Sequence, residues 1–273
     1  MAKKPTATRK KLPEFDKYYH YRESVQSPDE DAAFLEDIYR RAQGRKPTVF
    51  REDFCGTFAN CCAWVKRNSK NTAFGLDLDP EPINYGKTHY LPLLSRDQQA
   101  RVKIELKNVL GRNLPKADVI CALNFSYFIF KERQVLKSYF AACRKSLNAG
   151  GVFVIDAFGG PKCQEANEEV SENGNPPFDY FWDQDSFDPL THEAVFHIHF
   201  KRKGEKKRLN VFTYDWRMWT LPELRDLLLE VGFSKVEYLW EGTSADGHGD
   251  GNFQVVQKGE ECEAWVAYLA AHA

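Results

Sequence analysis

Between residues 48 and 158, short apolar segments alternate with segments of helical periodicity, and this order constrains the fold more than any other feature. Extended segments are predicted at 48–50, 72–77, 102–106, 118–123 and 152–158, and helices at 59–66, 80–94 and 132–147. Strands that alternate with helices are joined by right-handed crossovers into a mostly parallel sheet with helices on both faces. We therefore predict an α/β fold with a doubly wound sheet, whose ligands bind at the carboxyl ends of the strands.

The flanking segments follow other patterns. A capping sequence, Ser27-Pro28-Asp29-Glu30, predicts a helix of about four turns before the first strand. Residues 161–177 are polar and predict a linker or lid, and three extended runs then predict an antiparallel β insert at 180–185, 194–203 and 209–217. A helix at 221–231 and strands at 233–240 and 262–269 complete the chain. The predicted domains are a basic tail with a cap helix (1–44), a core (45–159 and 218–273), and a lid with the insert (160–217).

The composition is that of a soluble globular protein. The 273 residues have a net charge of -1, so a general attraction to nucleic acid is not expected. The seven cysteines form no Cys-x-x-Cys pair, which disfavours a disulfide framework or a structural zinc site. There is no apolar stretch of about 18 residues and no secretory signal at the start. We expect a cytoplasmic protein with no membrane association.

One turn carries the main chemical signal. The segment from Val49 to Phe58 leaves a strand, turns at Gly56 and enters a helix, while Asp77 ends the next strand. Backbone N–H groups at such a turn can bind a polar ligand, and a carboxylate at the second strand can accept hydrogen bonds from both hydroxyls of a ribose. This pattern marks nucleoside cofactors and by itself leaves NAD and S-adenosylmethionine open. The G-x-G-x-x-G pattern of dinucleotide sites is missing, because only Gly56 is present.

These residues resemble the class I S-adenosylmethionine-dependent methyltransferases. Glu52, Asp53 and the run Phe54-Cys55-Gly56-Thr57-Phe58 lie in register with the family's first motif, an acid, a variable residue and Gly-Cys-Gly-Thr-Gly, with both flanking glycines replaced by Phe. Gly75-Leu76-Asp77-Leu78-Asp79-Pro80-Glu81 is similar to the second motif, and later motifs resemble residues 107–110, 118–124, 147–156 and 221–233. The resemblance implies a Rossmann-like sheet of seven strands with the last strand antiparallel, and S-adenosylmethionine as the cofactor.

The resemblance also implies which residues bind that cofactor. It assigns Asp77 to the ribose, Leu78 to one face of the adenine, and Asn108 or the Val109 backbone to the adenine amino group. Asn124 and Phe125 are expected to border the methyl group. With the first motif, the implied cofactor residues are Glu52, Asp53, Cys55, Gly56, Thr57, Asp77, Leu78, Asn108, Val109, Asn124 and Phe125.

Residues for the acceptor follow from position alone. Tyr127 comes after the fourth strand, Asp156 lies near the end of the fifth, and Arg217 ends the insert, so each is a candidate substrate contact or else a structural hydrogen bond or salt bridge. No motif identifies a general base, so no catalytic residue is assigned. His197 and His199 share one strand face, but no third ligand is visible at suitable spacing, so no metal site is predicted.

The function predicted from these observations is methyl transfer from S-adenosylmethionine to a small molecule by in-line displacement. Two alternatives stay open. The basic residues in 1–14 and in 201–208 would suit an RNA methyltransferase. The same motifs would also suit a binding module without catalysis. Three tyrosines, Tyr18, Tyr19 and Tyr21, either close over the cofactor or pack the N-terminal helix.

Overall fold

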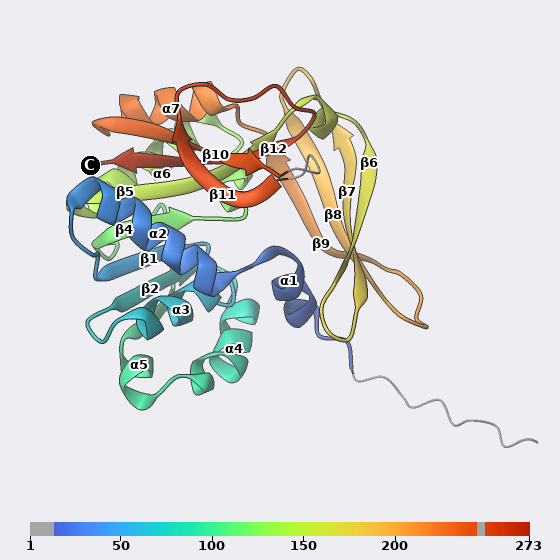
Figure 1. Ribbon diagram of the computed structural model, residues 1–273, viewed down its shortest axis with the longest axis horizontal. Helices are drawn as coiled ribbons and strands as arrows, with labels where there is room; N and C mark the ends of the chain where they lie inside the picture. The colour runs from blue at the N-terminus through green and yellow to red at the C-terminus, as the bar shows by residue number, and fades with distance from the viewer. Residues whose placement is uncertain (1–13, 245–248) are drawn as a thin grey trace, which may run out of the picture.

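The computed structural model describes residues 14–244 and 249–273 and contains two β-sheets (Figure 1). The basic residues before position 14 that were considered for RNA binding lie outside the described residues. Among the described residues, no helix is long and apolar enough to cross a membrane.

The larger sheet has eight strands and confirms the predicted α/β class. The neighbours β3, β2, β1, β4 and β5 are parallel, whereas β12 runs antiparallel to both β5 and β10. In sheet order the strands are β11 (Gly249–Val256), β10 (Lys235–Thr243), β12 (Trp265–His272), β5 (Leu147–Gly159), β4 (Ala117–Ala122), β1 (Val49–Asp53), β2 (Thr72–Asp77) and β3 (Val102–Leu106). The eighth strand, β11, was not predicted; it pairs with β10 at the sheet edge.

Helices cover both faces of this sheet (Figure 1). Strand β4 is buried along its whole length, and its side chains alternate between two cores. Val119 and Cys121 pack with α2 and α3, while Ile120 and Ala122 pack with α6 and α7. The helices are α1 (Lys17–Val25), α2 (Pro28–Gln43), α3 (Ala59–Arg67), α4 (Pro80–His89), α5 (Arg96–Ala100), α6 (Arg133–Ser146) and α7 (Leu221–Glu230), with 3-10 turns η1 (Leu91–Leu93), η2 (Ser126–Ile129) and η3 (Pro161–Gln164).

The second sheet is antiparallel and has four strands, one more than expected for the insert. Its strands are β6 (Asn167–Asn173), β7 (Phe178–Phe187), β8 (Glu193–Arg202) and β9 (Arg208–Arg217). The expectation that residues 161–177 form only a linker or lid was therefore wrong. Strand β6 is mostly exposed and acidic, with one apolar residue, and it pairs with β7 along its whole length.

Helix α1 connects the two sheets (Figure 1). On the core side, the Tyr85 hydroxyl in α4 donates to Asp16 at 2.6 Å, and Lys17 pairs with Glu81 at 2.6 Å. On the insert side, the ring of Tyr21 contacts Phe212 with centroids 5.0 Å apart. The N-terminal tyrosines thus pack against both sheets.

Candidate active site

The loop after β1 keeps the path of a glycine-rich turn although it has a single glycine. Phe54, Gly56 and Phe58 have φ values of 57°, 50° and 50°, in the left-handed region that non-glycine residues rarely adopt. Ring packing holds the two phenylalanines there: Phe54 lies against Phe130 and Tyr139, and Phe58 is fully buried. Strained backbone of this kind persists where surrounding packing fixes it, and it is frequent at functional sites.

Asp77 ties this loop to the end of β2. One carboxylate oxygen accepts the N–H of Gly56 at 2.7 Å, and the other accepts the N–H of Asp79 at 2.9 Å. A carboxylate has about four lone-pair positions, so both oxygens can accept further hydrogen bonds. The adjacent Leu78 side chain is 62% exposed, which leaves an apolar surface beside the acid. The turn therefore offers oxygen acceptors and an apolar face to the same ligand.

Close packing of α4 against the loop depends on Gly86. A Cβ atom at this position would lie 2.2 Å from the Thr57 carbonyl oxygen and 2.5 Å from the Phe58 ring. We expect Gly86→Ala to lower the free energy of unfolding by about 1–3 kcal/mol, because overpacking outweighs the helix preference for alanine. Urea titration measures this, with Thr88→Ala on the exposed side of α4 as the control. A stabilised Gly86→Ala protein would contradict the packing argument.

Glu52 and Asp53 lie on opposite faces of the sheet, because side chains alternate along β1. Glu52 faces α3, where the Asn60 amide donates to it at 2.9 Å and the Cys61 thiol lies 3.3 Å away. Asp53 faces α6 instead, where it pairs with Arg51 and accepts the Tyr139 hydroxyl at 3.0 Å. The Asp53 carboxylate is therefore engaged inside the core, and a contact of this residue with the cofactor stays a prediction.

The buried carboxyl of Glu52 makes stability depend on pH. Burial raises its pKa to about 8, so between about pH 4 and pH 8 the folded protein retains a proton that the unfolded chain has released. Stability therefore falls as pH rises through this window, by up to about 1.4 kcal/mol per pH unit. We expect Glu52→Gln to flatten this decline. Urea unfolding of both proteins at about pH 5 and about pH 8 tests it, and parallel declines would contradict it.

Other residues of the predicted cofactor set surround the same edge. The Cys55 side chain is buried and burial raises the pKa of its thiol, which disfavours a nucleophilic role. Asn108 is exposed, and its side-chain oxygen accepts the N–H of Leu110 at 2.8 Å, which orders the turn after β3. Val109 is buried beneath it.

Asp156 positions the loop after β4. Its two carboxylate oxygens accept the N–H groups of Asn124 at 2.7 Å and Phe125 at 2.9 Å, and both residues adopt left-handed φ values of 55° and 57°. Burial raises the pKa of Asp156 to about 7. Tyr127 is fully buried, and its hydroxyl donates to the Asp156 carbonyl at 2.8 Å. Tyr127 and Asp156 therefore hold the loop after β4 in place. This is the structural hydrogen-bonding role that was the alternative to a substrate contact for both residues.

An aromatic cavity of about 120 Å³ adjoins this loop. Three parts of the chain build it: α1, the loop after β4, and the inner face of the second sheet. The sequence reasoning had considered Tyr21, but it missed Tyr180, Trp182 and Ile198, whose shared face is visible only once β7 and β8 are paired. The lining residues are Tyr21, Val25, Asn124, Phe125, Tyr180, Trp182, Ile198, Tyr214 and Trp216.

Comparison with known proteins identifies the fold. No protein-family model and no curated protein matches the sequence. Among solved structures, an S-adenosylmethionine-dependent methyltransferase from Clostridium acetobutylicum is 16% identical with a TM-score of 0.68, covering 94% of this chain and 97% of that one. The chain has the methyltransferase fold.

Two further methyltransferase structures align over nearly their whole length. CalS10 from Micromonospora echinaspora, an amino pentose methyltransferase of calicheamicin biosynthesis, was determined with S-adenosylmethionine bound. It is 15% identical with a TM-score of 0.67, covering 97% of this chain and 99% of that one. The sugar N-methyltransferase KedS8 from Streptoalloteichus is 15% identical with a TM-score of 0.62, covering 100% of this chain and 98% of that one. The similarity therefore includes the second sheet as well as the larger sheet.

Arg217 is not among the residues that line the aromatic cavity, and it makes the salt bridge that was the alternative to a substrate contact. Its guanidinium lies 3.8 Å from the centre of the Trp219 ring and donates to the Lys131 carbonyl and the Glu223 carboxylate, each at 3.1 Å. These contacts join β9 to α7 and to the turn after η2. Arg217 thus fixes the return of the insert to the helices of the larger sheet.

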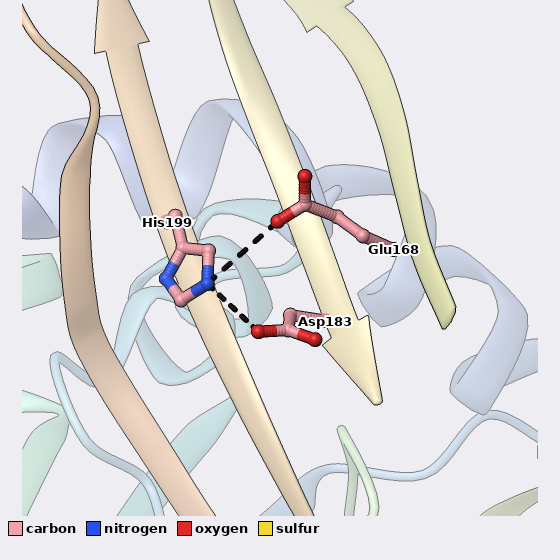
Figure 2. Close-up of side chains that lie close together, drawn as sticks. All are labelled: Glu168, Asp183 and His199. Carbon is pink, nitrogen blue, oxygen red and sulfur yellow. Dashed lines mark hydrogen bonds and ion pairs between the residues drawn. The ribbon is translucent and has the colours of Figure 1, made fainter. Parts of the chain in front are cut away.

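Figure 2 shows a cluster of Glu168, Asp183 and His199 on the outer face of the second sheet. The His199 Nδ1 atom accepts the N–H of Asn210 at 2.9 Å, so the ring proton is on Nε2, which donates to Asp183 at 3.0 Å. A metal at Nε2 would need the opposite tautomer. Lys207 also pairs with Glu168. We assign the cluster a structural role. His199 is only 3% exposed, and the carboxylates of Asp183 and Glu168 lie on its Nε2 side.

The basic hairpin between β8 and β9 is largely neutralised by nearby acids. Arg202 and Arg208 both pair with Glu205, and Lys201 pairs with Asp179. Arg208 also stacks over Phe15, 4.5 Å from its ring centre. Side chains that are held in this way are less available to bind phosphates.

Proposed function

We propose that this protein transfers a methyl group from S-adenosylmethionine to a small-molecule acceptor. The single observation that carries the proposal is the meeting of two features at one sheet edge: the Gly56–Asp77 turn and the aromatic cavity beside Asn124 and Phe125. The fold supports it, as do the solved structures of similar fold described as acting on an amino pentose and a sugar. The cavity volume of about 120 Å³ is sufficient for a small chemical group of the acceptor.

The proposed cofactor contacts fit the chemistry of the residues. Asp77 has acceptor positions to spare for two ribose hydroxyls, and the exposed Leu78 side chain offers an apolar face to the adenine. Asn108 and the Val109 backbone follow β3, and we propose that they bind the adenine amino group. We propose that the turn at Gly56 and Thr57, together with Glu52, binds the methionine part of the cofactor. Asn124 and Phe125 then separate this site from the acceptor cavity.

The chain's contribution to catalysis would be positioning. The cofactor supplies an activated methyl group, so the protein needs to hold the acceptor in line with it and to exclude water. Asp156 fixes the Asn124–Phe125 loop through two hydrogen bonds, and α1 with the second sheet closes the acceptor side. This arrangement requires no metal.

Calorimetric titration with S-adenosylmethionine tests the cofactor, and absence of binding would overturn the proposal. Incubation of the purified protein with labelled S-adenosylmethionine and a metabolite extract tests the transfer; a labelled small molecule is the expected result. Cofactor binding without any labelled product would favour a binding module. Labelled RNA, with an affinity that falls steeply as salt rises, would favour the RNA alternative.

A further inference from the structure

The acceptor cavity is unusual in its chemistry. Among the residues that the structure describes, no Lys, Arg, His, Asp or Glu lines it. Its walls are six aromatic rings with two aliphatic side chains and one amide. A cavity for a carboxylate or phosphate would need a cationic partner, which this lining does not supply.

The rings surround the cavity from several directions. Tyr214 and Trp216 stack with centroids 4.3 Å apart, and Trp182 lies 6.2 Å from Tyr214 and 6.4 Å from Trp216. Phe125 stands edge-on to Trp216 at 6.3 Å, on the side of the proposed cofactor site. Ring faces carry negative electrostatic potential, so a site enclosed by them attracts cations, and quaternary ammonium groups are bound in this way.

We propose that this aromatic cavity binds the amino group of the acceptor, so that the protein methylates nitrogen on a small amine. The inference rests on the proposed methyl transfer and adds the class of acceptor. The acceptor reacts as the neutral amine, and the ring faces of the cavity would stabilise the positive charge that forms on its nitrogen and that the methylated ammonium product carries.

The charge balance of the reaction agrees with this lining. The lone pair of a neutral amine forms the new N–C bond while the C–S bond breaks and its electron pair stays on sulfur. The positive charge moves from sulfur to nitrogen, and the methylated ammonium releases a proton to water. Ring faces on the acceptor side stabilise the charge as it arrives at nitrogen.

An alcohol acceptor fits less well because it must lose its proton to a base. Burial raises the pKa of Tyr21 to about 12 and raises the pKa values of Tyr180 and Tyr214 as well, so these hydroxyls stay protonated at neutral pH. Asp156 is not among the residues that line the cavity, and its carboxylate holds the backbone of Asn124 and Phe125. An amine that arrives with a free lone pair needs no such base.

The experiment compares two probes of similar shape that differ in charge, choline and 3,3-dimethylbutan-1-ol. Binding is measured by calorimetry with the protein saturated with S-adenosylhomocysteine. We expect choline to bind at least about tenfold more tightly than its neutral counterpart. Equal affinities, tighter binding of the alcohol, or no binding of choline would overturn the inference. Failure of the protein to bind S-adenosylmethionine would instead overturn the proposed function.

Variants place the effect in the cavity. Trp182→Leu removes one ring face and should abolish the preference for choline. Trp240→Leu is the matched control, because Trp240 packs against Trp265 and does not line the cavity. A preference retained in Trp182→Leu and lost in Trp240→Leu would overturn the assignment. As a second readout, labelled methyl transfer is compared for primary amines and the alcohols of the same carbon skeletons; label on alcohols alone would exclude an amine acceptor.

Discussion

Replacing Asp53 by alanine is expected to lower the free energy of unfolding by about 3–5 kcal/mol. Asp53 and Arg51 have fully buried side chains, with Nη2 to Oδ2 at 3.0 Å and Nε to Oδ1 at 2.9 Å. Removal of the carboxylate leaves the Arg51 guanidinium with the Pro115 carbonyl at 3.0 Å and no opposite charge. An uncompensated buried charge is among the costliest single changes in a protein core. Urea unfolding monitored by tryptophan fluorescence measures the loss.

Two further proteins show whether the pair is the cause. Asp97→Ala removes the exposed partner of Arg101 and should cost no more than about 1 kcal/mol. The double substitution Arg51→Met with Asp53→Leu should recover much of the stability lost in Asp53→Ala, because both charges are then gone. A loss in Asp53→Ala as small as that in Asp97→Ala would contradict the buried pair.

The Asp77→Ala substitution is expected to weaken S-adenosylmethionine binding by roughly 1–3 kcal/mol, about 5- to 150-fold in Kd. The variant loses the proposed ribose acceptor and also the hydrogen bonds from Gly56 and Asp79 that hold the turn. Isothermal titration of both proteins gives the ratio directly.

Asp79→Ala is the matched control for this measurement. Its carboxylate accepts the N–H of Glu81 at 2.8 Å and caps α4, so its loss should cost about 1 kcal/mol of stability while leaving Kd unchanged. An unchanged Kd in Asp77→Ala would show that the ribose acid was assigned to the wrong residue.

The alternating strands and helices of residues 48–158 could be predicted well, because the local sequence of each element has the pattern of a strand or a helix. β2 and β3 have the predicted bounds, since β2 is a short, mostly apolar segment and β3 alternates apolar and charged residues, both of which are typical of strands. The strand β6 could not be predicted in this way. Its sequence, Asn-Glu-Glu-Val-Ser-Glu-Asn, has one apolar residue, and it becomes a strand by pairing with β7 along all seven residues.

The site was predictable where a backbone turn defines it and unpredictable where packing does. Asp77 follows from its place at the end of a strand. The buried salt bridge of Asp53 could not be predicted, because a motif in linear order does not say which face of β1 packs against α6. The cavity residues Tyr180 and Trp182 are alternate positions of β7, and only the fold of the insert onto the core brings them to Asn124.

The bridging position of α1 bears on how the whole molecule melts. A four-stranded sheet that was joined to the larger sheet only by a flexible linker would unfold in a separate transition. Here α1 and its N-cap residue make a hydrogen bond and a salt bridge to α4, and α1 also packs against an aromatic ring of the second sheet. Unfolding of one sheet would therefore remove contacts that stabilise the other. We expect a single cooperative unfolding transition. We also expect that a ligand bound at either side of α1 slows amide hydrogen exchange in the insert and in the core together.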